Sequence, residues 1–403
     1  MSKLIGPFSE IITMSDVPEK GAIGDFSILR NGGIVIQNDK IIEIGDFSTL
    51  RVKNDDLIEI ESDHVLLPGL IDCHTHMCFG GSRAGDYALR VGGKTYQEIL
   101  KNGGGIHDTV NKTRNESQES LKNTLIQRVE RHLIEGVTTC EVKSGYGLSV
   151  ESELKILRAI KEANQTIASD LISTCLAAHV CPKEFDSPKA YLEHIVADLF
   201  PILIAENLTN RIDAFVEDGA FNPELTTWYL GEAKKAGFEL TLHADQFSSG
   251  GSEVAVNMNA LSADHLEASS EEDVKRLADS DVVCTVLPGA SLGLGMHYSP
   301  ARNLLDQGCC VAISTDWNPG SAPMGDLLIQ TALLGAAEKL SIGECIAGIT
   351  TRAAKALNLS DRGKLASGLL ADMIAFPTHD HREIFYQQGK LKPDMVWKNG
   401  ALQ

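Results

Sequence analysis

Eight short apolar runs, each of the length of a β-strand, recur between residues 66 and 314. Most are separated by segments with helical spacing, such as residues 151–163, which follow Ser149 as a predicted N-cap. This alternation is typical of an α/β protein with a parallel sheet. Eight strand–helix units favour a (β/α)8 TIM-like barrel over the alternative, a doubly wound open sheet. The runs are residues 66–72, 137–142, 171–178, 212–216, 239–242, 260–263, 282–286 and 310–314.

The two ends of the chain have a different sequence pattern, with short β-rich stretches and turns. Residues 33–45 form two such stretches around an Asn-Asp turn, which predicts a hairpin. Residues 370–376 and 395–400 return to short strands near the other terminus. We expect these segments to pair in a small β-sandwich domain that brings the termini together. The predicted domains are residues 66–366 for the barrel and residues 1–65 plus 367–403 for the β-sandwich.

The composition excludes several classes of protein. The formal net charge is -19, from 36 Lys and Arg against 55 Asp and Glu, so we expect no nucleic-acid partner. No apolar stretch is long enough to cross a bilayer, and no secretory signal is visible, so we expect no membrane partner. The nine cysteines are scattered without a CxxC pair, which favours a reduced, cytoplasmic protein. A small anionic substrate would need a local cation to offset this acidic surface.

Polar side chains with metal-binding chemistry follow several of the apolar runs. In a barrel, functional groups lie at the carboxyl ends of the strands, so residues that follow different runs share one rim. His74 and His76 come directly after the first run, and side chains two apart on a strand share a face. Five of the twelve histidines fall on this predicted rim. They are His74, His76, His179, His243 and His265.

Three imidazoles and one carboxylate are suited to one divalent metal per chain. We expect His74, His76, His243 and Asp316 to be its ligands. Ligand softness leaves Zn²⁺, Fe²⁺ and Mn²⁺ open. A water at such a metal ionises near neutral pH, and Asp316 could take its proton. His265 could orient that water or hold charge on a carbonyl oxygen, so the identity of the general base stays open.

The stretch from Pro68 to His76, with the later histidines and Asp316, resembles the amidohydrolase superfamily over nearly the whole chain. Within it, the sequence is similar to the imidazolonepropionase family of histidine degradation. Residues 79–84, 141–148 and 314–321 carry the closer match. The resemblance implies that water opens the ring of 4-imidazolone-5-propanoate to give N-formimino-L-glutamate, with Zn²⁺ or Fe (2+ or 3+) as the metal. Family members are often dimers, so a homodimer is an open alternative to a monomer.

The resemblance also implies a set of substrate-binding residues. The propanoate tail needs a cation, and Arg83 lies just after the first pair of histidines, where its guanidinium could hold a carboxylate. The family positions that match Tyr146 and His179 contact substrate. Asn318, Gly320 and Ser321 follow Asp316 and could bind the tail or the new carboxylate.

Gln246 distinguishes two reactions of the superfamily. Nucleobase deaminases carry a Glu three residues after the histidine that matches His243, and this Glu shuttles protons to the ring. Gln has no titratable proton, so we expect Gln246 to hydrogen-bond substrate during hydrolysis of a cyclic amide. Related binuclear enzymes carry a bridging lysine after strand four, where this chain has Glu217, so we expect one metal. A catalytically inactive barrel serving as a scaffold is a further alternative.

Overall fold

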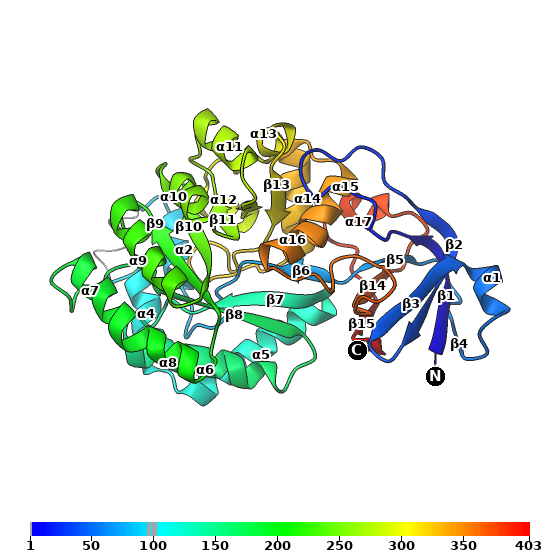
Figure 1. Cartoon of the computed structure of the whole chain (residues 1–403), viewed down its shortest axis with the longest axis horizontal. Coiled ribbons are helices and arrows are strands. Elements are labelled where there is room, and N and C mark those ends of the chain that lie inside the picture. The colour runs from blue at the N-terminus through cyan, green and yellow to red at the C-terminus, as the bar shows by residue number, and fades with distance from the viewer. Residues whose placement is uncertain (1, 95–97, 99–102) are drawn as a thin grey trace.

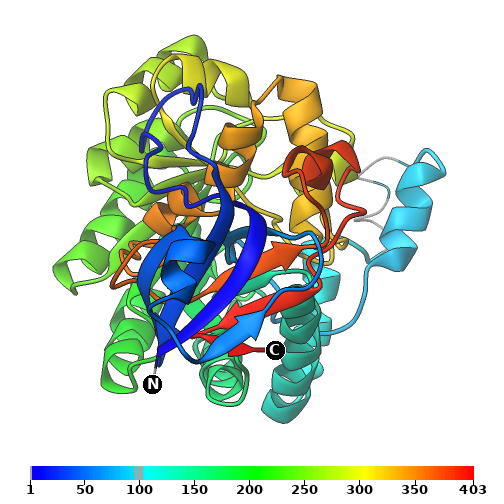
Figure 2. The same cartoon turned by 90° about the vertical axis from the view of Figure 1, so that its right-hand side faces the viewer.

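The structure is a computed structural model that describes residues 2–94, 98 and 103–403. Its strands fall into two sheets, each with eight strands. One sheet is surrounded by helices, and the other lies beside it and holds both chain termini (Figures 1 and 2). The small domain built from both ends of the chain, predicted from the sequence, is therefore present.

The first sheet is the predicted parallel barrel. Its strands neighbour one another in chain order from β6 to β13, and every pairing between them is parallel. The helices between the strands lie outside the sheet (Figure 1). This arrangement confirms the barrel and excludes a doubly wound open sheet. The strands are β6 (Leu70–Asp72), β7 (Val137–Lys143), β8 (Asp170–Ala178), β9 (Arg211–Val216), β10 (Glu239–Ala244), β11 (Ser262–His265), β12 (Val283–Val286) and β13 (Cys310–Ile313).

Most of the helices between the barrel strands pack against this sheet, whereas the short helix at residues 47–51 packs against the other sheet. The helix predicted behind Ser149 is α6 (Val150–Asn164), and the Ser149 side chain accepts a hydrogen bond from the Ser152 amide. The remaining helices are α1 (Phe47–Arg51), α2 (Ala84–Val91), α4 (Ile106–Asn115), α5 (Gln118–Ile134), α7 (Pro188–His194), η1 (Ile195–Leu199), α8 (Phe200–Ala205), α9 (Pro223–Lys235), α10 (Gly251–Met258), α11 (Glu271–Ala278), α12 (Pro288–Leu294), α13 (Ala301–Asp306), α14 (Leu327–Glu338), α15 (Ile342–Gly348), α16 (Thr351–Ala356) and α17 (Arg382–Tyr386).

The first apolar run is two strands rather than one barrel strand, which corrects the prediction for residues 66–72. The β5 strand (Val65–Pro68) pairs with the terminal sheet, and β6 begins the barrel after Gly69. A side chain at Gly69 would place its Cβ 2.4 Å from Thr138 Oγ1, so only glycine fits this close approach. Composition cannot reveal the break, because both strands are fully buried and are apolar up to Asp72 at the end of β6.

The second sheet joins the two ends of the chain. The predicted hairpin is β2 with β3, and β14 pairs antiparallel with β5 and β15. Its core gathers side chains from both ends, including Phe8 and Trp397, whose rings meet edge to face. The strands are β1 (Ser2–Ile11), β2 (Leu29–Gln37), β3 (Lys40–Asp46), β4 (Leu57–Glu59), β14 (Met373–Phe376), β15 (Met395–Lys398) and β16 (Ala401–Leu402).

The seam between the first and last barrel strands is closed by the segments that follow them. The Asp72 carboxylate accepts hydrogen bonds from the Ser314 hydroxyl and from the Thr315 amide and hydroxyl. Beyond this point the Asp316 amide donates to the carbonyl of His74 at 3.1 Å. The closure of the barrel therefore brings His74 and Asp316 to the same point of the rim.

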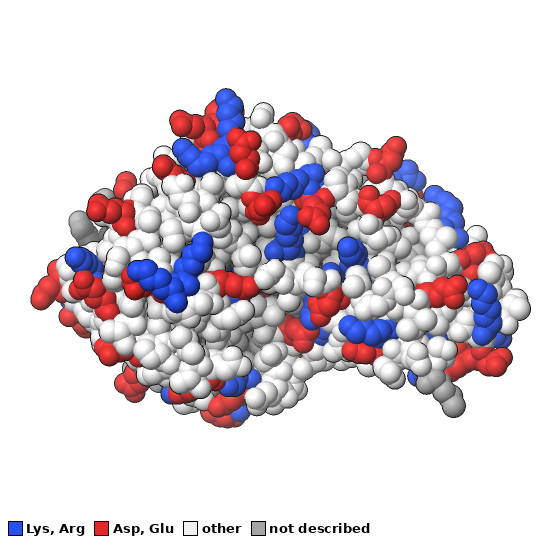
Figure 3. All heavy atoms as spheres, viewed as in Figure 1, with Lys and Arg blue, Asp and Glu red and all other residues white. Residues whose placement is uncertain are grey.

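Acidic and basic side chains are interspersed over the face shown in Figure 3. Within the described part of the chain, no helix is long and apolar enough to span a membrane.

Candidate active site

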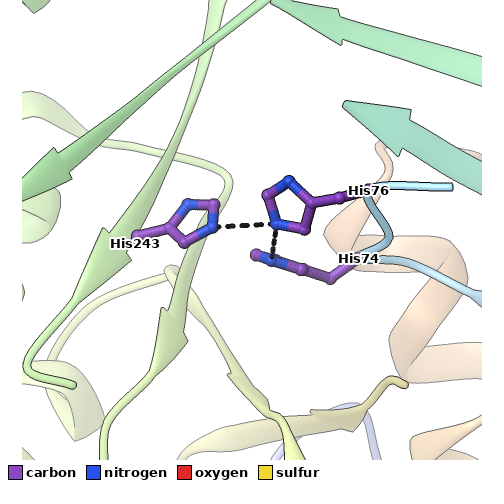
Figure 4. Close-up of side chains that lie close together, drawn as sticks. All are labelled: His74, His76 and His243. Atoms are coloured by element: carbon purple, nitrogen blue, oxygen red, sulfur yellow. Dashed lines mark hydrogen bonds between the residues drawn. The ribbon is translucent and has the colours of Figure 1, made fainter. Parts of the chain in front are cut away.

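Four side chains converge at the carboxyl end of the barrel. Nε2 of His76 lies 3.2 Å from Nε2 of His74 and 3.2 Å from Nε2 of His243. The Asp316 carboxylate lies 3.3 Å from His76 Nε2 and 3.6 Å from His74 Nε2. Figure 4 shows the three imidazoles pointing toward one another from the ends of two strands. All four residues are buried.

These separations fit a shared metal ion. Ligands about 2.1 Å from a tetrahedral ion lie roughly 3.4 Å from one another. Burial holds the pKa of the His74 and His243 imidazoles well below the ordinary value. Burial opposes ionisation of Asp316, but the adjacent His76 ring brings the pKa of this carboxyl below its ordinary value. Neutral imidazoles and an ionised carboxylate are the forms that bind a metal.

Two buried carboxylates orient two of these imidazoles. Asp264 Oδ2 lies 2.7 Å from Nδ1 of His74, and Asp213 Oδ2 lies 2.9 Å from Nδ1 of His243. The hydrogen bond to Asp264 places the His74 proton on Nδ1, and the Asp213 carboxylate beside Nδ1 of His243 favours the same tautomer there. Both arrangements leave the Nε2 lone pair for the shared point. Asp213 was not among the predicted site residues, because it lies inside a strand rather than at a strand end. A signal was present, since Asp213 is a charged residue inside the apolar strand β9.

Lys143 lies beneath this layer and is fully buried. Its Nζ lies 2.8 Å from Glu141, 2.9 Å from Asp213 and 3.7 Å from Asp264. Burial alone would lower the pKa of Lys143, but the three carboxylates, Asp213 foremost, raise it. The ammonium is therefore charged and joins the two carboxylates that hold His74 and His243.

His265 lies at the end of β11, beside the converging ligands. Its ring centroid is 5.3 Å from that of His243 and 5.8 Å from that of His74. Burial lowers the pKa of His265, but the charge of Glu267, 3.6 Å from Nδ1, raises it above the ordinary value. The backbone of His265 has φ of 90°, and that of Asp316 has φ of 51°. Strained backbone of this kind is concentrated at functional sites.

Tyr146 and His179 form one wall of the site. The His179 ring is stacked on His76 with centroids 5.7 Å apart, and Tyr146 lies 5.6 Å from His179. His179 Nδ1 donates to the carbonyl of Gly145 at 3.0 Å, so its Nε2 is free to accept a hydrogen bond. Burial, reinforced by the nearby His76, lowers the pKa of His179 to about 4. This imidazole is therefore neutral at physiological pH.

Arg83 lies at the start of α2 and is oriented toward the loop after Asp316. Its Nε donates to Asp86 Oδ2 at 2.9 Å, and Asp86 also accepts from the Gly105 amide at 2.8 Å. A Cβ built on Gly320 would lie 2.4 Å from an Arg83 terminal nitrogen, so the guanidinium packs directly against Gly320. The expected carboxylate-binding residue is thus adjacent to the expected substrate loop.

Sequence comparison identifies the family. The sequence profile of the amidohydrolase family matches residues 65–402. An imidazolonepropionase from Acinetobacter baumannii is 39% identical over 382 residues, which span 94% of this chain and 95% of that protein. One from Bdellovibrio bacteriovorus is 37% identical, over 93% of this chain and 89% of that protein. The chain belongs to the imidazolonepropionase family. It is accordingly an enzyme of the hydrolase class.

Solved structures support the fold of this imidazolonepropionase family member. A triazine hydrolase variant superposes with a TM-score of 0.77 at 19% identity, over 100% of this chain and 94% of that chain. An adenosine deaminase from Xanthomonas campestris with bound zinc gives a TM-score of 0.74 at 15% identity, over 99% of this chain and 92% of that chain. The latter structure contains zinc, and this chain has a triad of histidines that could hold a metal ion.

The loop after Asp316 is closed by its own side chains in this family member. Asn318 Oδ1 accepts from the Gly320 amide at 2.7 Å and from the Ser321 amide at 2.8 Å. Its Nδ2 donates to the Asp316 carbonyl and to the Ser321 hydroxyl. The donors that we expected to meet substrate here are engaged within the loop, so substrate would have to exchange with these internal hydrogen bonds.

Glu217 forms hydrogen bonds with the loop that follows His243. Its carboxylate accepts from the amides of Phe247 and Ser248, at 2.8 and 3.2 Å, and from the Ser248 hydroxyl. Gln246, the preceding residue, is largely buried. Through these hydrogen bonds, Glu217 orders the loop that carries Gln246.

Proposed function

We propose that this enzyme binds one divalent metal, Zn²⁺ or Fe²⁺, through His74, His76, His243 and Asp316, and that it hydrolyses the ring of 4-imidazolone-5-propanoate. The observation that carries the proposal is the convergence of three Nε2 atoms and one carboxylate. Nε2 of His76 lies 3.2 Å from Nε2 of His74 and of His243 and 3.3 Å from the Asp316 carboxylate. Family membership supplies the substrate, since the relatives are imidazolonepropionases. The reaction is the step of histidine degradation that gives N-formimino-L-glutamate.

Lone pairs on neighbouring nitrogens repel one another at van der Waals distance unless a cation or a proton lies between them. Nδ1 of His74 and of His243 is committed to a carboxylate, which supports a shared cation rather than a shared proton. A metal in this position would lower the pKa of a water and polarise the ring carbonyl.

Asp316 and His265 are the groups that would move the proton. Asp316 lies within the ligand cluster, so it can accept a proton from the attacking water. Water adds to the ring carbonyl carbon, the amide C–N bond breaks, and the departing nitrogen takes up the proton while the carbonyl becomes a carboxylate. His265, whose pKa is raised, can stabilise the negative oxygen that develops on the carbonyl.

Seven residues would hold the substrate in place. Arg83 would pair with the propanoate carboxylate through its guanidinium group. Tyr146 and His179 would hydrogen-bond the ring or the carboxylate, and Gln246 would hydrogen-bond the ring without exchanging a proton. The loop of Asn318, Gly320 and Ser321 would close over the tail or the new carboxylate. The absence of a titratable group at position 246 disfavours deamination of a nucleobase-like ring.

The test is the ultraviolet absorbance of 4-imidazolone-5-propanoate mixed with purified enzyme, before and after a chelator, with metal content measured on the same sample. We expect chelator-sensitive decay to N-formimino-L-glutamate and about one metal per chain. His243→Ala should lose both the metal and the decay, whereas His194→Ala, a half-exposed histidine of α7, should retain both. Unchanged decay in His243→Ala would contradict the proposed centre, and ammonia release from aminated rings would favour a deaminase.

A further inference from the structure

The loop that carries Tyr146 is held by side chains from three other segments. It connects β7 to α6 and comprises residues 144–148. Its backbone polar groups around Tyr146 have no regular secondary structure to satisfy them, yet Tyr146 itself is buried. Unpaired backbone groups at this depth would be costly, so the loop needs external partners.

Glu153 supplies the partners for the N–H groups. This residue lies in α6 and its side chain is completely buried. Its Oε2 accepts from the Gly145 amide at 2.9 Å, and its Oε1 accepts from the amides of Gly147 and Leu148 at 2.7 and 2.8 Å. One carboxylate thus takes three backbone donors, on both sides of Tyr146.

Arg114 and His179 supply the partners for the carbonyl groups. Arg114, near the end of α4, donates from Nε to the Gly147 carbonyl at 2.6 Å and from Nη2 to the Leu148 carbonyl at 3.1 Å. His179 Nδ1 donates to the Gly145 carbonyl. The backbone amide and the backbone carbonyl of Gly145, Gly147 and Leu148 are therefore each satisfied by a side chain.

The loop conformation depends on these anchors. Gly145 has φ of 113° and Leu148 has φ of 50°, and the latter is an unfavourable value for a leucine. A Cβ on Gly147 would lie 2.7 Å from Glu153 Oε1, so the loop backbone is pressed against this carboxylate. A conformation with this much strain persists only where its surroundings impose it.

We infer that Glu153 and Arg114 are positioning residues that set the Tyr146 phenol against the substrate from opposite sides of the loop. This inference rests on the proposed function, in which Tyr146 contacts the substrate. Neither residue touches the metal ligands, so the anchors govern substrate binding and orientation and leave the metal centre intact. The Glu153 carboxylate bonds to three backbone amides of the loop and to the Ser144 side chain, which also belongs to the loop. Its effect on turnover must therefore pass through the residues of the loop.

The central variant is Glu153→Gln. The glutamine side-chain oxygen can still accept hydrogen bonds from the backbone amides of Gly147 and Leu148. Its NH2 group, however, faces the backbone amide of Gly145, so two donors meet and a hydrogen bond is replaced by a repulsive contact. We expect kcat/KM to fall by about tenfold to hundredfold, largely through KM, as for misplacement of a substrate-positioning group. Metal content should stay at the wild-type level. Hydrogen exchange of the peptide that covers residues 144–148 should accelerate, while exchange in β10 should not change.

Two further variants keep the test decisive. Tyr146→Phe removes the phenol, and adding Glu153→Gln to it should cost less than threefold more in kcat/KM if the anchor acts through Tyr146. Arg114→Met retains the apolar stem, is half-exposed in the wild type and should reproduce the loop exchange if Glu153→Gln fails to fold. Glu344→Gln is the matched control, since Glu344 is also a buried acceptor of backbone amides, at Ser341 and Ile23, but lies outside the site.

The outcomes separate the inference from the proposed function. A wild-type KM in Tyr146→Phe would refute the assigned role of Tyr146, and the inference would fall with it. Reduced activity in Tyr146→Phe together with wild-type KM and loop exchange in Glu153→Gln would overturn the inference alone. Equal losses of kcat/KM in Glu153→Gln and Glu344→Gln would also overturn it, because the effect would then be one of general stability.

Discussion

Asp264 accepts a hydrogen bond from Nδ1 of His74 at 2.7 Å, and both side chains are completely removed from solvent. The pairing fixes the orientation of an imidazole that is expected to bind metal through its other nitrogen. Burial raises the pKa of Asp264, while the Lys143 ammonium opposes this shift. Asp264 therefore relies on His74 and Lys143 to stay ionised, which links the three residues into one unit.

Asp264→Asn should weaken metal binding. The variant loaded with metal should still turn over, so its reaction can be measured. The amide is a weaker partner for Nδ1 and can present a donor to it, so the His74 ring loses its preferred tautomer. We expect metal affinity to fall by about tenfold to hundredfold, as measured by competition with a chelator. Asp372→Asn is the control, because Asp372 is also buried and pairs with a lysine, but in the terminal sheet. Equal affinity in both variants would contradict the orienting role.

Lys143→Met should destabilise the protein and weaken its metal site together. The substitution leaves Glu141, Asp213 and Asp264 without their shared cation, and breaking a buried ion pair on one side costs about 3–5 kcal/mol. The urea midpoint of the metal-free protein should fall by an amount that corresponds to this free energy. Lys398→Met also removes a buried lysine that bridges two carboxylates. It should lower the midpoint but leave metal affinity unchanged, and a loss of affinity there would count against a specific role for Lys143.

The residues of the barrel rim were predictable because polar side chains directly follow the apolar runs of the sequence. In a parallel barrel, the residue after each apolar run lies on the same edge, so His243 and Asp316 could be placed beside His74 from spacing alone. The eight barrel strands followed from the alternation of apolar runs and helical segments, although the first run proved to be two strands. The pairing of the two ends of the chain followed from their short β-rich stretches.

The residues that support the rim were not predictable in the same way. Asp213 lies inside a strand, and Glu153 lies on a helix that begins five residues after its loop partner Gly145. Their roles depend on the direction of a side chain in three dimensions, which periodicity does not specify beyond a choice of face. The break at Gly69 escaped prediction because it depends on the approach of Thr138, a residue far along the chain.

Arg83→Ala should lower the affinity of the enzyme for its substrate. If Arg83 pairs with the propanoate carboxylate, truncation leaves that charge without a partner in a partly buried site, at a cost of about 2–4 kcal/mol. KM should rise by about 30- to 700-fold with a smaller change in kcat. Steady-state kinetics with 4-imidazolone-5-propanoate measure both constants. Arg90→Ala on the same helix is the control, since Arg90 lies over Tyr87. A normal KM in Arg83→Ala would remove this residue from the substrate site.

The junction of the two sheets should show an acid-dependent stability that traces to Asp170. Burial pushes the pKa of Asp170 up, but Lys398, 2.8 Å away, and Arg362 lower it below its ordinary value of 3.8. A folded-state pKa below the unfolded value means that the unfolded chain binds more protons. The stabilisation is therefore complete above about pH 4 and is lost as the pH falls through the folded-state pKa.

Asp170→Asn removes this contribution at every pH. Its urea midpoint should lie below that of the wild type near pH 6, and the difference should shrink as the pH falls below about 4, because the wild type then loses its own ion pair. The measurement uses chelator-treated protein, so that protonation of the metal-binding histidines does not add a loss of metal to the comparison. Asp55→Asn, at an exposed carboxylate, should show no such convergence. A difference between Asp170→Asn and wild type that stays constant from pH 6 to 3 would show that Asp170 stabilises the junction without a change in its pKa.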